Sequence, residues 1–291
     1  MKTFLCSLFL ATTLFSSAPA LAQPAASVEA VQMPAWVERN GRRTPLLPGM
    51  ELRAGDQIFT GAGSRALVRL AEGSVVKLGE NGTLRFAELS PTQEIFKAAL
   101  GVLQGAFRFT TEAFYKFRGK REVDVRFTTV TVGIRGTDLW GKSADDREIV
   151  VLIEGKITLV RDGEAPQTMD QPKTVYEAPR AAAALPIVPV DPNQLARWAA
   201  ETEIAAGGGA SRSGGRWRVY VAQASSQAEA QAAADRLTEA GYAAQVSRIA
   251  EGRSHSYWVH LDGLPSRVEA QALADRLRGQ LGITSTSISL H

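Results

Sequence analysis

The sequence predicts a multidomain protein in which an all-β central domain precedes an α+β C-terminal domain of βαββαβ order. Two observations favour this class. Short apolar alternations separated by glycine turns fill residues 41–165, which is typical of an all-β domain. A strand–helix–strand pattern then occurs twice within residues 216–291, as in a split sheet covered by two helices. A chain of 291 residues has room for both domains and for the segments between them.

The N-terminus has the three parts of a secretory signal, which we assign to residues 1–22. Lys2 gives a positive start, Phe4–Phe15 is mostly apolar, and Ala20-Leu21-Ala22 presents small residues at a cleavage site. We therefore expect export to the periplasm, with cleavage after Ala22. An uncleaved anchor is the alternative, although the apolar run is shorter than the roughly 20 residues of a membrane span. No later segment is long and apolar enough to span a bilayer.

Composition then divides the mature chain. Residues 23–40 are rich in Pro and Ala and are interpreted as a flexible leader. Within residues 41–165, turn sequences such as Glu72-Gly73-Ser74 separate short strands such as Ser64–Leu70. Strands of this length and spacing are compatible with a sandwich, a roll or a helix-like stack.

Residues 166–215 are rich in Pro, Ala, Gly and Ser and are interpreted as a linker. One helix is expected near residues 191–205, with Asp191 as its cap and Pro192 in its first turn. Its apolar face comprises Leu195, Trp198 and Ala199. The glycines at 207–209 then break the chain. A linker of this composition is expected to let the two domains move independently.

The C-terminal region contains an internal repeat, which is the strongest pattern in the sequence. The segment Ser226–Leu237 recurs 40 residues later as Ser266–Leu277, with nine of twelve positions identical. Apolar residues in both copies recur at spacings of three and four, as on one face of a helix. Ser226 and Ser266 are expected N-caps, each with a glutamate three residues on. The order predicts a ferredoxin-like sheet with both helices on one face and the other face bare.

Alternation along the two central strands predicts which side chains lie on the bare face. Val219 and Val221 are expected to face the helices, whereas Ala222 falls on the outer face by strict alternation. The residues predicted to hold a ligand there are Arg218, Tyr220, Gln223, Trp258 and His260. Aromatic rings stack on the apolar faces of sugar rings, and polar side chains bond sugar hydroxyls. Packing of these aromatics against the linker or a partner chain is the structural alternative.

The segment Tyr257-Trp258-Val259-His260-Leu261, followed by Ser266–Leu277, and its earlier twin resemble the SPOR domain family. The resemblance covers about 75 residues, from 216 to 291. It implies a βαββαβ fold that binds peptidoglycan on its exposed sheet face, in particular glycan strands stripped of stem peptides. Localisation at the division site is typical of this family. The chain departs from it at Ala222-Gln223-Ala224, where Gly and an aromatic are common, and at Trp258-Val259-His260, where Arg-Val-Arg is common.

Three motifs of the central region resemble the FecR domain family. They are the opening Gly55-Asp56, the segment Gly133-Ile134-Arg135-Gly136-Thr137-Asp138, and the closing Glu154-Gly155 turn. FecR proteins sense a periplasmic signal and control a sigma factor through a cytoplasmic tail, but here a secretory signal stands in place of that tail. The resemblance therefore implies an extracytoplasmic β module that senses or docks an envelope protein.

Residues that carry chemistry do not form a recognisable catalytic or metal site. Cys6, the only cysteine, lies in the signal, so the mature chain is expected to have no thiol. The three histidines, His255, His260 and His291, show no metal-ligand spacing, and no nucleophile elbow occurs. A net charge of +3 does not indicate a nucleic-acid partner. We therefore expect a non-enzymatic protein without metal or cofactor.

Three functions remain open at this point. The leading one is a periplasmic adaptor whose C-terminal domain holds peptidoglycan glycan strands while the β domain docks or senses an unknown envelope protein. The second is an envelope signalling protein, with the FecR-like region as receptor and the C-terminal domain as a wall tether. The third is a structural protein in which both domains are protein–protein interaction modules.

Overall fold

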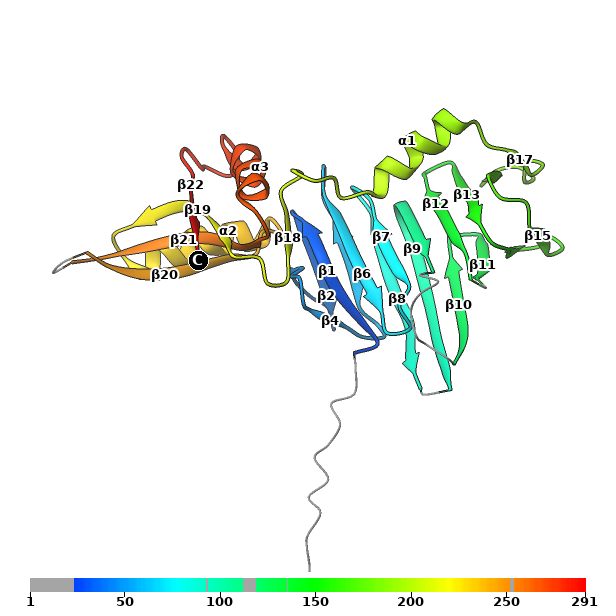
Figure 1. The fold of residues 1–291 in the computed structure, drawn as a ribbon, viewed down its shortest axis with the longest axis horizontal. Helices are drawn as coiled ribbons and strands as arrows, with labels where there is room; N and C mark the ends of the chain where they lie inside the picture. Colours follow the sequence, from blue (N-terminus) through cyan, green and yellow to red (C-terminus); the bar gives the residue numbers. More distant parts are fainter. Residues whose placement is uncertain (1–23, 93, 112–118, 135, 252–253) are drawn as a thin grey trace, which may run out of the picture.

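The computed structural model describes residues 24–291, except for 93, 112–118, 135 and 252–253. We call residues 24–212 the β domain and residues 213–291 the C-terminal domain, and the two lie side by side (Figure 1). The predicted signal, residues 1–22, lies outside the described residues. Within the described part of the chain, no helix has the length and apolarity needed to cross a membrane.

The strands of the β domain pair into two sheets that share one strand, β9. The first sheet has the order β18-β1-β6-β7-β9-β12-β13-β16-β17, with β4 paired to the start of β1. Its strands are β1 (Ala26–Gln32), β4 (Glu51–Leu52), β6 (Arg65–Leu70), β7 (Val75–Leu78), β9 (Ile95–Thr110), β12 (Asp138–Ser143), β13 (Arg147–Glu154), β16 (Thr174–Pro179), β17 (Val188–Pro189) and β18 (Ala210–Arg212).

The second sheet has the order β3-β2-β5-β8-β9-β10-β11-β14-β15. Its further strands are β2 (Ala35–Arg39), β3 (Arg42–Pro45), β5 (Gln57–Thr60), β8 (Thr83–Pro91), β10 (Lys120–Arg126), β11 (Val130–Ile134), β14 (Ile157–Arg161) and β15 (Gln167–Met169). The pair β9–β10 is parallel, and the other pairs in this sheet are antiparallel.

The long strand β9 connects the two sheets. Its first part pairs with β8 and β10 in the second sheet, and its last residues pair with β7 and β12 in the first. Gly105 lies where the pairing changes, with a φ of +85°. A Cβ at this position would stand 2.7 Å from the Cα of Gly82. Both the conformation and the close approach therefore require glycine at the bend.

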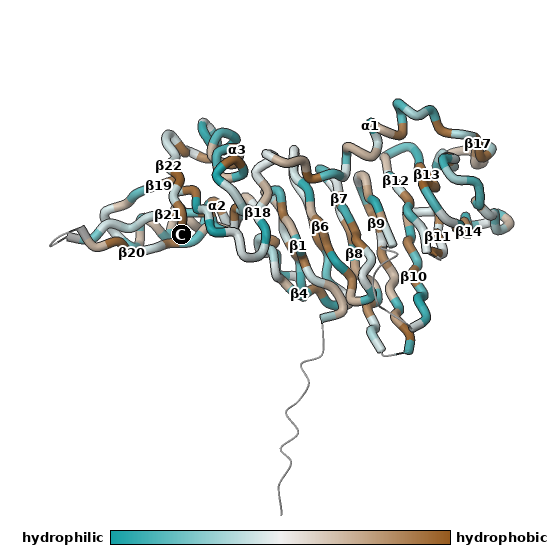
Figure 2. The backbone as a smooth tube through the Cα atoms, viewed as in Figure 1, coloured by the Kyte–Doolittle hydropathy of each residue, from teal (hydrophilic) through white to brown (hydrophobic). Residues whose placement is uncertain are grey.

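The two sheets pack face to face around a hydrophobic core. β6 shows the pattern, because Ala66, Val68 and Leu70 are buried while the residues between them are partly exposed. In Figure 2 hydrophobic and hydrophilic stretches follow one another along the strands, as expected for strands with one buried face. Of the three architectures that the sequence left open, the structure has the sandwich.

The interpretation of residues 23–40 as a flexible leader is wrong for the part that the structure describes. β1 pairs with β6 and β18, and β2 pairs with β3 and β5. Small apolar residues such as Val28 and Val37 are buried within these strands. Pro24 and Pro34 stand outside both strands, so the overall Pro/Ala content concealed a period-two pattern.

Much of the expected linker, residues 166–215, also belongs to the β domain, since it supplies β15, β16, β17 and β18. β16 is buried on both faces. Tyr176 and Ala178 pack into the sandwich core, and Val175 packs in a second cluster beneath the helix α1 (Pro192–Thr202). A strand covered on both sides lacks the polar alternation that marks a strand in a sequence, and for this reason composition suggested a linker.

The helix α1 forms where the sequence predicted it and packs over the first sheet (Figure 1). The Asp191 side chain accepts a hydrogen bond from Gln194 N at 2.9 Å and caps the helix. Leu195 and Trp198 pack against the sheet. The Trp198 ring stacks on Trp140 of β12, with ring centroids 5.2 Å apart and an interplanar angle of 12°. The helix is thus part of the β domain.

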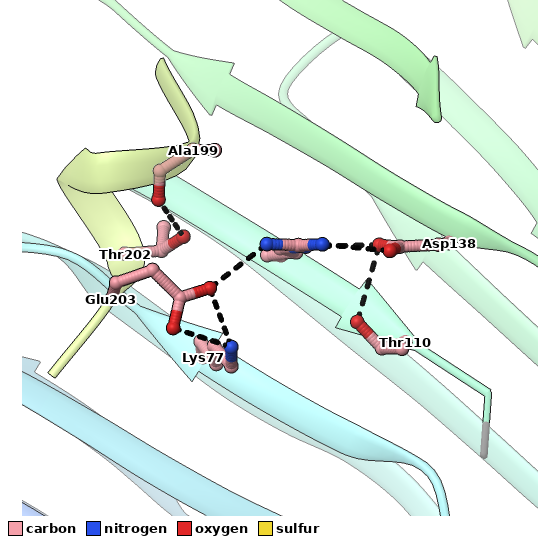
Figure 3. A network of polar contacts seen from close by, with 7 residues as sticks. Lys77, Thr110, Asp138, Ala199, Thr202 and Glu203 are labelled. Atoms are coloured by element: carbon pink, nitrogen blue, oxygen red, sulfur yellow. Dashed lines mark hydrogen bonds and ion pairs between the residues drawn. The ribbon is translucent and has the colours of Figure 1, made fainter. Parts of the chain in front are cut away.

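An ion-pair network holds the residue after α1 against the same sheet (Figure 3). Glu203 accepts hydrogen bonds from Lys77 Nζ at 2.6 Å and from Arg108 Nη1 at 2.8 Å. Arg108 also donates to Asp138 at 2.7 Å, and Asp138 accepts from Thr110 Oγ1 at 3.1 Å. The hydrogen bond to Asp138 raises the pKa of the Arg108 guanidinium. Asp138, the end of the FecR-like segment, therefore has a structural role.

The C-terminal domain is a four-stranded antiparallel sheet with the order β20-β21-β19-β22 and two helices. Its elements are β19 (Trp217–Ala224), α2 (Gln227–Glu239), β20 (Ala244–Glu251), β21 (Ser254–Leu264), α3 (Arg267–Leu277) and β22 (Ser287–Leu290). Both helices begin as the repeat predicted. Ser226 Oγ accepts from Glu229 N at 3.3 Å, and Ser266 Oγ accepts from Glu269 N at 3.2 Å.

The two domains meet in a fixed junction, in place of the independent motion expected from a linker. The carboxylate of Glu269, on α3, accepts hydrogen bonds from Gly207 N at 2.7 Å, Gly209 N at 2.6 Å and Ala210 N at 3.0 Å. Arg276 Nη1 donates to Gly208 O at 3.2 Å. We call residues 207–210 the glycine loop. α3 holds this loop at the point where β18, which begins at Ala210, joins the first sheet.

A second contact joins the loop after α2 to β2. Ala35 N donates to Gly241 O and Trp36 Nε1 donates to Glu239 O, both at 3.1 Å. A Cβ on Gly241, whose φ is +84°, would stand 2.5 Å from the Trp36 ring. The buried hydrophobic residues of the two domains form one continuous cluster. The domains therefore pack as a unit.

Candidate functional site

The face of the C-terminal sheet opposite its helices carries the predicted site residues. Val219 and Leu261 are fully buried in the core shared with α2 and α3. Tyr220, next to Val219 on β19, and Trp258, three residues before Leu261 on β21, remain partly exposed. Alternation along β19 and β21 thus places Val219 and Leu261 inside, as the sequence predicted. On the opposite face Tyr220 and Trp258 are partly exposed, whereas His260 is buried.

A β-bulge in β19 determines which residue lies opposite Trp258. Tyr220 pairs with His260, but the register then shifts, so that Ala222 pairs with Val259 and Gln223 pairs with Trp258. Ala222 consequently packs against the core, contrary to strict alternation. The exposed Gln223 side chain takes the outer position beside the tryptophan.

Three rings form a cluster at the centre of this face. Tyr220 lies edge-on to Trp258, with ring centroids 5.3 Å apart, and edge-on to His260, with ring centroids 5.7 Å apart. Trp258 Nε1 donates to Ser256 Oγ at 2.9 Å, which fixes the indole. T-shaped pairs of this kind stabilise each other beyond their buried area. The cluster is therefore a preorganised aromatic surface.

Arg218 and His260 are both engaged by Asp262, at one end of the face. Arg218 Nε donates to Asp262 Oδ1 at 2.5 Å and Arg218 Nη2 donates to Oδ2 at 2.8 Å, while His260 Nδ1 lies 3.0 Å from Oδ1. Burial alone would raise the pKa of Asp262, but the hydrogen bonds from His260 and Arg218 outweigh it and hold that pKa well below its ordinary value. The bidentate bond to Asp262 in turn raises the pKa of Arg218.

Two hollows flank the Tyr220–Trp258 pair. The larger, of about 330 Å³, lies toward β22 and has Gln223 on its wall. The smaller, of about 240 Å³, extends toward Ile249 of β20. Further lining comes from Val221, Ala222, Ser285, Thr286, Ser287 and Ser289. Rings, hydroxyls and aliphatic groups therefore line both hollows, the Gln223 amide adds to the larger one, and no charged side chain is among these lining residues.

The structure separates the predicted site residues into two groups. Tyr220, Gln223 and Trp258 are accessible and border the hollows. His260 is 2% exposed and Arg218 is held in its ion pair, so these two support the face rather than offer free groups to a ligand. For His260 the expectation of an open ligand contact is thus corrected, because the ring packs beneath Tyr220.

Sequence reasoning missed three polar contributors. Asp262 follows Trp258 and His260 at period two, so alternation could have placed it on this face. Ser287 and Ser289 of β22 pair with Tyr220 and Arg218, but a lone alternation of serines in a short strand is a weak signal.

Elsewhere, the described residues include no group of three or more His, Cys, Asp or Glu side chains that could hold a metal ion. A polar hollow of about 470 Å³ lies in the β domain beside the end of α1. Its wall includes Glu80, Gln104, Asp145 and the ion pair Lys142–Glu201, with Nζ and Oε2 2.8 Å apart.

Comparison with known families assigns both domains. The FecR protein family model matches residues 56–158, and the SPOR domain model matches residues 213–288. The first match lies within the sandwich, and the second covers the sheet with the aromatic face. No curated protein is significantly similar to the chain.

Two solved structures of a candidate anti-sigma factor from Parabacteroides distasonis ATCC 8503 are similar in part. They share 19% and 20% sequence identity, both with a TM-score of 0.40, and each comparison covers 49% of this chain. The chain spans 64% and 63% of the lengths of those two proteins. The family matches carry the assignment: this chain joins a FecR domain to a C-terminal SPOR domain.

Proposed function

We propose that the chain is an exported, non-catalytic adaptor that binds peptidoglycan in the periplasm. The C-terminal domain, which we assign to the ferredoxin-like arrangement, would hold a glycan strand across its helix-free face. The β domain would dock or sense a protein of the cell envelope. The predicted signal at residues 1–22 supports export, and the SPOR match supports the ligand class.

One observation carries this proposal, namely the partly exposed pair Tyr220–Trp258 between two uncharged hollows. An aromatic ring offers a flat apolar surface to the C–H face of a sugar. The serine hydroxyls and the Gln223 amide can donate to and accept from sugar hydroxyls. Both hollows lie on the sheet face, where a glycan strand would be free to continue past either side. A polymeric glycan fits this arrangement.

Co-sedimentation with purified sacculi tests the proposal. The full mature chain is expected to pellet with sacculi, and Trp258→Ala is expected to reduce the pelleted fraction at least ten-fold. Val268→Ala is the matched control, because Val268 is 66% exposed on α3, away from the aromatic face. Equal retention of all three proteins would refute this face as the site.

The second candidate is an envelope signalling protein whose β domain is the receptor, which the FecR match over residues 56–158 favours. Trp140 is fully buried beneath Trp198, so a partner at the FecR-like segment would meet the exposed turn at Gly136. Glu154 pairs with Asp138 beside this turn and is exposed. A photo-cross-linking residue at Glu154 would capture one specific membrane partner in vivo. If no cross-linked adduct forms at Glu154, the receptor function is refuted.

A further inference from the structure

The two hollows on the aromatic face have no charge to offer a ligand. Their walls are apolar, aromatic, hydroxyl or amide groups. Arg218 lies on this face, but its guanidinium is engaged in a bidentate bond to Asp262, and its side chain is 13% exposed. Releasing Arg218 for a ligand would leave the partly buried Asp262 carboxylate without its bidentate guanidinium partner and with only the contact to His260, which is unfavourable.

Peptidoglycan offers this face two kinds of sugar. N-acetylglucosamine is uncharged. N-acetylmuramic acid bears a lactyl group, whose carboxylate is free wherever the stem peptide has been removed. A free carboxylate placed in an uncharged hollow would lose hydration and gain no cation in return. An uncharged lining of this kind favours the uncharged sugar.

Resting on the function proposed above, we propose that the hollows beside Tyr220 and Trp258 are subsites for the uncharged N-acetylhexosamine units of the glycan strand. The larger hollow, of about 330 Å³, reaches the lower end of the volumes of small-molecule pockets, which begin at about 300 Å³. The smaller hollow, of about 240 Å³, lies below that range, so each hollow suits no more than one sugar residue. Gln223 and Ser287, at the rim, are placed to bond the acetamido and hydroxyl groups. The lactyl carboxylate points to solvent.

Calorimetry with defined oligosaccharides tests this selectivity on the full mature chain. Chitohexaose, an uncharged N-acetylglucosamine oligomer, is expected to bind, with a Kd that changes less than two-fold between about 20 mM and about 500 mM NaCl, since screening acts on charges. Hexagalacturonate, which carries a carboxylate on each sugar, is expected to bind at least ten-fold more weakly. Trp258→Phe keeps a ring and is expected to retain most of the chitohexaose affinity, whereas Trp258→Ala loses at least ten-fold.

Ser287→Arg introduces a cation at the rim of both hollows and gives a gain-of-function arm. It is expected to create hexagalacturonate binding that disappears at high salt. Preferential binding of hexagalacturonate by the wild-type chain would overturn the inference, as would an unchanged ligand preference in Ser287→Arg. If chitohexaose fails to bind while sacculi still bind in a Trp258-dependent manner, the inference fails and the proposed function stands. If sacculi also fail to bind, both fail.

Discussion

Glu269 holds the glycine loop that joins the two domains, and removing its carboxylate measures how firmly they are joined. Glu269→Ala leaves the N–H groups of Gly207, Gly209 and Ala210 without their acceptor. A hydrogen bond to a charged group contributes about 1.5–3 kcal/mol. Water can reach part of the loop and replace some of these hydrogen bonds. We therefore expect the free energy that holds the loop closed to fall by about 2–3 kcal/mol in total.

Hydrogen exchange of the loop amides is the suitable assay. At about 1.4 kcal/mol per factor of ten, the expected loss corresponds to exchange about 30- to 150-fold faster at these three amides. Glu229→Ala is the matched control, since Glu229 occupies the same repeat position on α2 but accepts from Ser225 Oγ at 3.3 Å instead. Both variants lose a glutamate three residues after the serine that caps the helix, so the difference between them measures the contribution of the junction. Equal exchange in the two variants would refute the account of the junction.

Three further outcomes are expected. Trp198→Ala removes the stack on Trp140 and should lower the free energy of unfolding of the β domain by about 2–3 kcal/mol; a loss below about 0.5 kcal/mol in urea titration would contradict the packing of α1. Gly241→Ala places a Cβ 2.5 Å from the Trp36 ring at a φ of +84° and should lower the free energy of unfolding by about 1–3 kcal/mol. Gly279→Ala, at a φ of +78° in open space, should show only the part of this loss that comes from the backbone conformation. The pKa of Asp262 is depressed in the folded protein, so the ionised carboxylate stabilises the fold above its unfolded pKa of about 3.9, and this stabilisation is lost as the pH falls from there toward the folded pKa. The difference in the free energy of unfolding between wild type and Asp262→Asn should therefore shrink from pH 7 to about pH 3. A difference that stays constant over this range would contradict the ion pair.

The order of elements in the C-terminal domain could be predicted because its signals are local. A cap such as Ser266 and a helix with period 3.6 depend on residues within a few positions of one another. The accessible aromatic pair Tyr220–Trp258 followed from alternation in the same way. The FecR and SPOR motifs also lie in short continuous segments, and both assignments are confirmed.

Features that depend on contacts between distant segments could not be predicted. The bulge after Tyr220 is a property of pairing with β21, and it moves Ala222 inward. Glu229 and Glu269 have the same local sequence context, but only Glu269 lies against the glycine loop. The loop composition of residues 166–215 suggested flexibility, since nothing local shows that β16 is covered by a helix on one side and by the core on the other.

The direct test of the central claim is a ¹⁵N NMR titration of the tryptophan indoles with soluble glycan strands released from sacculi by amidase. The chain has five tryptophans, and Trp258→Phe assigns the signal of interest. We expect the Trp258 indole resonance to shift while those of Trp140 and Trp198, in the β domain, stay in place. A titration that moves the Trp140 or Trp198 signals and leaves Trp258 unchanged would contradict the assignment of the C-terminal sheet face as the glycan site.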